Sequence, residues 1–427
     1  MPPATLAQDT APRQAADGHW WLPGLANLHS HAFQRAMAGL AERQGDPHDS
    51  FWTWRELMYR FAGRFDPDTL HAVACQLYAE MLEAGYTTVC EFHYLHHQPD
   101  GRPYADPAAM SKALVAAARD TGIRLTLLPV LYMAGGFDGR ALSERQRCFG
   151  HSLDDYLALL QSLRALRDDT LEVGVALHSL RAVPPDAMNT LLAAIAGEPM
   201  PIHIHVAEQL PEVEECVALR GARPVRWLLD SAEVDARWTL VHATHLDEGE
   251  VRGIAASGAT VAICPTTEAN LGDGFFPLAD FLAAGGHWGV GSDSHVSVSV
   301  VEELRWLEYG QRLRTHRRNV AVSPAQPSTG ALLFQQAHAG GLRACGQPAS
   351  ADDRVVLDGD APVLAGATSA DLLDRFVFAG NRPLVREVHV AGQARVREGR
   401  HRDAAAIAGR HRQALSTLLQ GGGDGRA

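Results

Sequence analysis

The sequence predicts an α/β protein: a (β/α)8 TIM-like barrel with a small β-domain built from the two ends of the chain. Eight short apolar, β-branched runs alternate with helix-like stretches, the pattern of strand–helix units and a parallel sheet. Histidines and one aspartate stand at the carboxyl ends of these runs, the rim where barrel enzymes carry their chemistry. No GxGxxG segment follows the first run, which argues against an open, doubly wound sheet.

The runs that predict strands are bounded by stretches with helical periodicity. The expected strands are residues 22–29, 86–93, 123–131, 171–178, 201–206, 238–242, 259–264 and 287–293. Helices are expected between them, in stretches such as 67–83, 107–120, 153–167, 186–196 and 211–230.

The length of 427 residues and the apolar content of 46% fit one large domain with a small one. We expect the barrel to span residues 22–345. Short strand candidates with turn glycines predict the small β-domain from residues 1–21 plus 346–402, and residues 403–427 read as a terminal helix and tail. Residues 30–66 form a long excursion after the first strand, and long connections inside compact domains are often functional.

The formal net charge of −12, without any Lys/Arg run, argues against a nucleic-acid partner. A small anionic substrate stays compatible with this charge, because a few local arginines can reverse the field inside one cleft. No apolar run approaches the roughly 18 residues of a membrane span. The six cysteines lie far apart without a CxxC pair, and the first residues lack the pattern of a signal peptide. We therefore expect a cytoplasmic protein with no membrane partner.

His29-Ser30-His31 places two imidazoles on the same side of an extended chain. An HxH pair alone is weak evidence for a metal site in a chain with 21 histidines. Three further residues strengthen the prediction of a metal site, because His205, His242 and Asp293 stand at the ends of the fifth, sixth and eighth expected strands. Histidine nitrogens with one carboxylate suit zinc or another borderline divalent metal.

The strings PGLANLHSHAFQ, HVAEQ, VHATHLD, CPTTEANLGDG and GSDSH resemble the amidohydrolase superfamily. Within it the chain is similar to the formimidoylglutamate deiminases of histidine degradation, over roughly residues 22–345. The resemblance implies one divalent metal, Zn2+ in first place, whose bound hydroxide attacks N-formimino-L-glutamate and releases N-formyl-L-glutamate and ammonia. It also implies a homodimer. The implied metal ligands are His29, His31, His205 and Asp293; the implied proton-handling groups are His242, Glu208 and Asp293; the implied substrate contacts are Gln34, Arg55, Tyr94, His178 and Arg181.

Lys112 is the only lysine of the chain and lies in an expected helix. Binuclear members of the superfamily bridge two metals with a carboxylated lysine at the end of strand 4, whereas the corresponding strand here ends in His178. We therefore expect a single metal in the catalytic site.

Arg55 in the long excursion and Arg181 just past the fourth strand could each bind a carboxylate of a small anionic, amino-acid-derived substrate. A related mononuclear deaminase acting on a purine, pyrimidine or triazine ring is the alternative, and it would need base-stacking aromatics instead of two arginines. A non-catalytic barrel with a structural metal would not need Glu208 and His242.

Several aromatic side chains receive no catalytic role from the sequence. Trp52 and Trp54 are interpreted as loop packing rather than as substrate contacts. His96 and His97 are interpreted as structural or solvent-facing, and His93 has no role.

Overall fold

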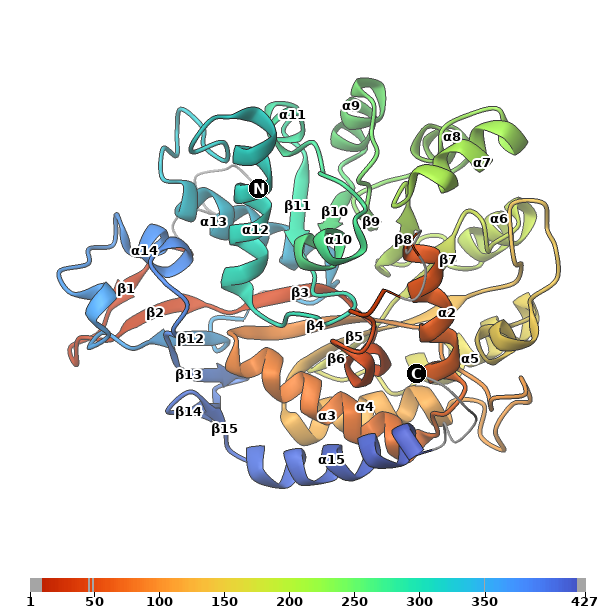
Figure 1. Ribbon diagram of the computed structural model, residues 1–427, viewed down its shortest axis with the longest axis horizontal. Helices are drawn as coiled ribbons and strands as arrows, with labels where there is room; N and C mark the ends of the chain where they lie inside the picture. The colour runs from red at the N-terminus through yellow and green to blue at the C-terminus, as the bar shows by residue number, and fades with distance from the viewer. Residues whose placement is uncertain (1–9, 45–46, 48–49, 349, 421–427) are drawn as a thin grey trace.

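The computed structural model describes residues 10–44, 47, 50–348 and 350–420 (Figure 1). Parallel strands form a nearly closed barrel in the order β11-β10-β9-β8-β7-β5-β4-β3, with the short β6 also paired to β5. The predicted (β/α)8 barrel is thereby confirmed. Its strands are β3 (Leu25–Ser30), β4 (Tyr86–His93), β5 (Arg124–Leu131), β6 (Leu171–Val173), β7 (Val175–Ser179), β8 (Ile202–Val206), β9 (Trp238–His242), β10 (Thr260–Ile263) and β11 (His287–Val290).

The barrel closes at its carboxyl-end rim between β3 and the segment that follows β11. The backbone N–H of Asp293 donates to the carbonyl of His29 at 2.9 Å, and the N–H of His31 donates to the carbonyl of Asp293 at 3.3 Å. These bonds take the place of a regular ladder, because β11 ends at Val290. The closure therefore brings the HxH pair directly against Asp293.

The two ends of the chain build a separate antiparallel sheet, at the left of Figure 1, in the order β1-β2-β12-β13-β14-β15. This agrees with the expected small β-domain, while the exact domain boundaries stay a prediction. The strands are β1 (Arg13–Gln14), β2 (Trp20–Pro23), β12 (Arg354–Leu357), β13 (Val385–Val390), β14 (Gln393–Arg397) and β15 (Arg400–His401).

The predicted first barrel strand, 22–29, was wrong at its start. Leu22 and Pro23 belong to β2 and pair with Val355 and Arg354 of the small sheet. The apolar run passes through Gly24, where a Cβ atom would lie 2.2 Å from the side chain of Thr87. An apolar run alone does not say which sheet it joins, and here it changes sheet at this glycine.

Helices surround the barrel, and α15 at the lower edge of Figure 1 runs beside α3. The Arg64 guanidinium ties this last helix down by donating to the carbonyl of Leu418 at 3.0 Å. The α-helices are α2 (Phe51–Ala62), α3 (Pro67–Glu83), α4 (Ala109–Thr121), α5 (Leu153–Arg164), α6 (Pro185–Ala194), α7 (Leu210–Arg220), α8 (Pro224–Ser231), α9 (Glu248–Ser257), α10 (Pro265–Leu271), α11 (Leu278–Ala283), α12 (Val300–Thr315), α13 (Thr329–Ala344), α14 (Leu372–Phe378) and α15 (Ala404–Gln420), and the 3-10 helices are η1 (Ala32–Met37), η2 (Glu144–Phe149) and η3 (Pro362–Leu364).

The excursion after β3 carries η1 and α2. Ser50 caps the start of helix α2. Its hydroxyl accepts the N–H of Trp52, and the Thr53 hydroxyl accepts the N–H of Ser50, a capping box that fixes where the helix begins. The buried face of α2 includes Met58 and Tyr59, both of which line the pocket at the barrel rim. The excursion is thus packed onto the mouth of the barrel.

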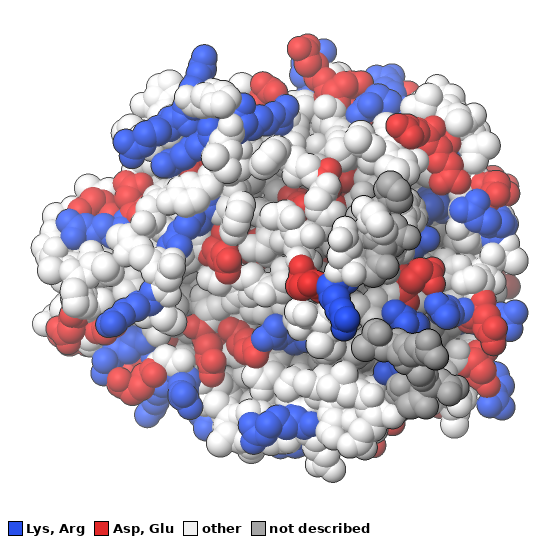
Figure 2. Space-filling view, viewed as in Figure 1, with Lys and Arg blue, Asp and Glu red and all other residues white. Residues whose placement is uncertain are grey.

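Acidic and basic side chains are interspersed over the face shown in Figure 2, with one basic group at the upper left. Among the described residues, no helix has both the length and the apolar character needed to cross a bilayer.

One ion pair joins the barrel to the small sheet. Arg124 at the start of β5 donates Nε–H to Asp353 at 2.5 Å and a second N–H to the carbonyl of Asp169 at 2.6 Å, while Asp353 also accepts the N–H of Ala391. The two charged side chains are only 10% and 11% exposed, so each depends on the other for its charge to be tolerated.

We expect Asp353→Ala to lower the free energy of unfolding by about 3 kcal/mol, because it leaves the Arg124 charge buried without its partner. Urea denaturation measures this loss. Asp352→Ala, at an exposed neighbouring position, is the control and should change the stability by less than about 0.5 kcal/mol. Equal stability of the two variants would contradict this account of how the sheet is joined.

Candidate active site

Four side chains predicted as metal ligands meet at the rim of the barrel. His29 lies in β3 and His31 just after it, His205 lies in β8, and Asp293 follows β11. All four are buried: their exposed fractions are 0%, 3%, 9% and 5%. Because parallel strands end at one rim, residues more than 260 positions apart in the chain become neighbours.

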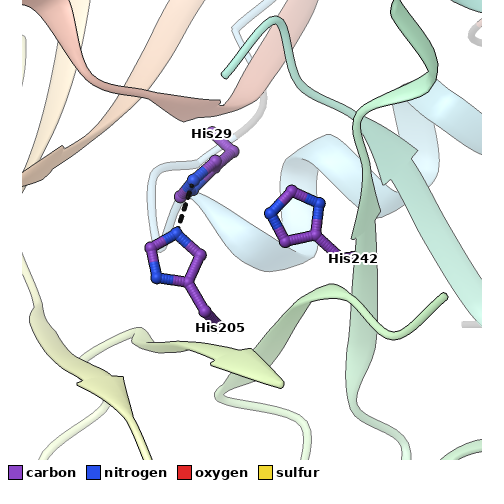
Figure 3. Close-up of side chains that lie close together, drawn as sticks. All are labelled: His29, His205 and His242. Atoms are coloured by element: carbon purple, nitrogen blue, oxygen red, sulfur yellow. Dashed lines mark hydrogen bonds between the residues drawn. The ribbon is translucent and has the colours of Figure 1, made fainter. Parts of the chain in front are cut away.

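The potential ligand atoms have the spacing expected around one ion. The Nε2 atom of His29 lies 3.0 Å from that of His31 and 2.9 Å from that of His205. Oδ1 of Asp293 lies 3.4 Å from His29 Nε2 and 3.3 Å from His31 Nε2. Ligands about 2.0–2.1 Å from a tetrahedral zinc ion would be separated by about 3.3 Å. His242 also approaches His29 and His205, and Figure 3 shows the three rings turned toward one another.

Hydrogen bonds set the tautomers of two of these imidazoles. Nδ1 of His31 lies 2.8 Å from the carbonyl of Phe92, and Nδ1 of His205 lies 2.8 Å from the carbonyl of His178. A carbonyl only accepts, so each Nδ1 carries the proton and each Nε2 presents a lone pair toward His29. Metal-binding histidines are commonly oriented in this way.

Burial keeps these imidazoles neutral. It lowers the pKa of His29 well below its usual value, and the nearby His31 and His242 lower it further. Burial likewise lowers the pKa of His205, with His29 and His178 adding to the effect. Three imidazole nitrogens therefore face one another, and His29 can offer at most one proton to the other two. A cation satisfies all three lone pairs at once, so the residues present fit a divalent metal.

The backbone is strained at two of the candidate catalytic positions. His242 has φ +68° and Asp293 has φ +46°, in the left-handed region that non-glycine residues rarely adopt. Such a conformation costs about 1–3 kcal/mol and persists only where surrounding contacts enforce it. Here it turns both side chains from the strand ends into the site.

His242 lies among three carboxylates. Its Nδ1–H points to Glu268 Oε1 at 3.3 Å, which leaves Nε2 facing Glu208 Oε1 at 3.7 Å and Asp293 Oδ2 at 3.8 Å. Burial alone would lower the pKa of His242, but the charge of Glu208 and the hydrogen bonds to Cys264 and Glu268 raise it well above its usual value. Burial raises the pKa of Glu208 to about 7. This pair can therefore exchange protons near neutral pH.

All five predicted substrate contacts line one pocket together with three of the four candidate metal ligands, His31, His205 and Asp293. Gln34 Nε2 donates to the Tyr94 hydroxyl at 2.8 Å, and Gln34 Oε1 is buried without a partner among the described residues. The His178 ring lies 4.2 Å from that of Tyr132. The pocket is lined by His31, Gln34, Phe51, Trp54, Arg55, Met58, Tyr59, Tyr94, Tyr132, Phe149, His178, Ser179, Arg181, His205, Glu208, Glu212, His242, Leu271 and Asp293.

Two guanidinium groups share one aromatic ring at this pocket. Arg55 lies 4.3 Å and Arg181 5.6 Å from the Trp52 ring centroid. Neither guanidinium donates a hydrogen bond to any residue that the structure describes, and Arg55 Nε is buried without a partner. Two positive groups held this close together favour an anionic ligand with more than one acid group.

Sequence reasoning missed several residues that position the site. Trp52 stacks on both arginines and Trp54 lines the pocket, so interpreting them as loop packing was incomplete. Glu91 accepts the Ser30 hydroxyl and the Ala32 N–H, both at 2.6 Å, and so clamps the HxH segment. A carboxylate inside the apolar run YTTVCEFH was a signal that could have revealed it. Tyr59, Tyr132, Glu212 and Glu268 carried no such signal.

The chain belongs to the amidohydrolase family, whose sequence profile matches residues 20–329. It is 55% identical over 405 residues to formimidoylglutamate deiminase of Pseudomonas aeruginosa, covering 93% of this chain and 89% of that protein. It is 27% identical to a 5-methylthioadenosine/S-adenosylhomocysteine deaminase of Natronomonas pharaonis, over 95% of this chain and 89% of that one. A crystal structure of an amidohydrolase from Brucella melitensis superposes with a TM-score of 0.89 at 47% identity, covering 93% of this chain and 90% of the other.

The Glu91 clamp makes the stability of the protein depend on pH. Burial raises the pKa of Glu91 from 4.5 to about 7, while the hydrogen bonds from Ala32, Ser30 and Tyr78 oppose that shift. A carboxyl whose pKa is raised on folding stabilises most below its unfolded pKa, and this stabilisation is lost as pH rises through the folded pKa.

We therefore expect Glu91→Gln to flatten the fall in stability between pH 5 and 8 by about 3 kcal/mol, at about 1.4 kcal/mol per pKa unit. Denaturant titrations at several pH values measure it. Glu248→Gln, at a side chain that is 90% exposed, should leave the wild-type profile unchanged. A Glu91→Gln profile parallel to that of the wild type would show that this carboxyl does not titrate on folding.

Proposed function

We propose that this chain hydrolyses the C=N bond of N-formimino-L-glutamate to N-formyl-L-glutamate and ammonia, a reaction of histidine degradation. The observation that carries the proposal is a single pocket with two unpaired guanidinium groups beside a cluster of neutral imidazoles and proton-exchanging carboxylates. The substrate has an amidine-like head and two carboxylates, so its two ends match the two kinds of group. The 55% identity to a formimidoylglutamate deiminase supports the same reaction.

The family implies a divalent metal, and we propose Zn2+ held by His29, His31, His205 and Asp293. When bound, such an ion lowers the pKa of a water molecule to about 7 and so supplies a nucleophile at neutral pH. We propose a single ion in this pocket. Lys112, the sole lysine, is exposed on α4 and pairs with Asp106 at 2.6 Å, so it offers no bridge for a second one.

The proton transfers are proposed for three side chains. Asp293 accepts the proton that the water gives up on attacking the sp2 carbon, and His242, whose Nε2 faces Asp293, takes part in orienting that water. Glu208, whose pKa of about 7 leaves a substantial protonated fraction at neutral pH, donates a proton to the nitrogen that leaves as ammonia. Glu268 holds His242 in the orientation that these transfers need, through its bond to Nδ1.

The substrate is held by groups that are otherwise unsatisfied. Arg55 and Arg181 each bind one carboxylate, since neither has a protein acceptor among the described residues. The free Oε1 of Gln34 accepts an N–H of the formimino head. Tyr94 fixes the amide of Gln34, and neutral His178, whose pKa is lowered by burial and then by Arg181, completes the contact.

We further propose that the protein works in the cytoplasm as a homodimer. Helix α12 exposes Trp306, Tyr309 and Leu313 at helical spacing, with exposed fractions of 44%, 38% and 68%. An apolar stripe of this kind suits burial against a second copy.

Removal of the metal should abolish ammonia release from N-formimino-L-glutamate, and adding zinc back should restore it, because the three imidazoles alone generate no nucleophile. Metal analysis paired with an ammonia assay before and after chelation measures both effects. Circular dichroism checks that the barrel stays folded. Undiminished activity in metal-free protein would refute the role of the metal, and no ammonia release from the zinc-loaded protein would refute the proposed reaction.

Arg55→Ala and Arg181→Ala should each raise KM for N-formimino-L-glutamate by about 10–100-fold, the effect of losing one charge-assisted contact. Arg60→Ala, at an exposed site on the same helix α2, is the matched control and should keep the wild-type KM. Turnover of an aminated purine, pyrimidine or triazine that survives the first two changes would favour the ring deaminase instead.

A further inference from the structure

Four histidines outside the candidate active site form a second buried cluster. His93 ends β4, His96 and His97 follow it, and His151 lies between η2 and α5. Their exposed fractions are 3%, 1%, 9% and 9%, and none of the four lines the substrate pocket. Buried histidines usually find hydrogen-bond partners on both ring nitrogens or lie beside an ion, so four together call for a reason.

Among His96, His97 and His151, two of the three ring spacings are close to those of the candidate metal ligands, and the third is wider. The His151 ring centroid lies 4.3 Å from that of His96 and 4.6 Å from that of His97, and the latter two are 6.2 Å apart. At the active site the corresponding three distances are 4.5, 4.8 and 5.4 Å. The fourth ring, of His93, lies 4.8 Å from that of His96.

The hydrogen bonds also repeat the pattern of the active site. Nε2 of His96 donates to the carbonyl of Val130 at 3.3 Å, and Nε2 of His97 donates to the carbonyl of Gly150 at 2.7 Å. Each ring therefore presents a bare lone pair on Nδ1. These two Nδ1 atoms, together with Nδ1 of His151 and Nε2 of His93, are buried and have no partner among the described residues.

Protonation does not satisfy these lone pairs. Burial, with a smaller contribution from neighbouring histidines, lowers the pKa of His93 and of His151 to about 3. Buried acceptors without a donor cost free energy, and several of them together need a shared partner. Asp155 at the start of α5 adds a negative charge close to His97 and His151, which favours a cation as that partner.

We propose that His96, His97 and His151 bind a second divalent transition-metal ion, with His93 as an additional ligand or hydrogen-bond partner at its edge. Neutral imidazoles without an oxygen-rich shell select Zn2+, Ni2+, Co2+ or Cu2+ over Mg2+ and Ca2+. This ion is separate from the one in the substrate pocket and shares no ligand with it.

The position of the cluster gives such an ion a structural role. The N–H groups of His96 and His97 both donate to the carbonyl of Cys148, at 3.0 and 2.9 Å, so the two segments already touch. These segments also carry Tyr94 and Phe149, which pack against each other in the wall of the substrate pocket with ring centroids 5.1 Å apart. The ion would therefore cross-link the two segments that form this part of the pocket wall.

Zinc stoichiometry tests the proposal. The full-length protein is loaded with zinc, dialysed against metal-free buffer and analysed by mass spectrometry of the metal. We expect about two zinc ions per chain in the wild type and about one in His97→Asn and in His151→Asn. His316→Asn, at an exposed histidine that ends α12, is the matched control and should keep about two.

One zinc per chain in the wild type overturns the proposal, and so does an unchanged count in both cluster variants. If those variants fail to fold by circular dichroism, crystals of the zinc-loaded wild type decide instead. An anomalous zinc peak about 2.0–2.1 Å from the ring nitrogens of the cluster supports the site. A water molecule there, with a peak in the substrate pocket alone, refutes it.

Discussion

Two backbone hydrogen bonds between the first barrel strand and the segment after the last one hold the candidate active site together. They join His29 and His31 to Asp293, so the HxH pair and the carboxylate cannot separate unless the barrel opens. Asn27 and Ser292 are joined by two further hydrogen bonds, of 2.6 and 3.0 Å, and together these contacts between β3 and the segment after β11 form a seam that closes the barrel. Barrel closure therefore also brings together three of the four proposed metal ligands, His29, His31 and Asp293.

The seam also explains why so much could be predicted from the sequence. Parallel strands bring their carboxyl ends to one rim, so polar residues at the ends of apolar runs had to converge, and His205 and His242 do. What escaped prediction depends on contacts between distant segments. Glu91 is known as a clamp only once it meets Ser30, and the start of the first strand was wrong because its apolar run continues into another sheet.

The pocket combines two kinds of electrostatic group. Burial lowers the pKa of His29 and of His205, which keeps these two imidazoles neutral, and it raises the pKa of Glu208 to about 7, so that this carboxyl can change protonation state near neutral pH. Arg55 and Arg181 place fixed charges beside the Trp52 ring at the same pocket.

Helix α2 lies outside the strand–helix repeat, yet it supplies Arg55 and the aromatic ring on which both guanidinium groups rest. Every side chain proposed to bind the metal or move protons comes instead from the strand ends or the turns that follow them. Natural variation in the length of this one excursion could thus redirect a related barrel from dicarboxylic to monocarboxylic or uncharged compounds. The residues at the strand ends that are proposed to carry out hydrolysis would stay unchanged.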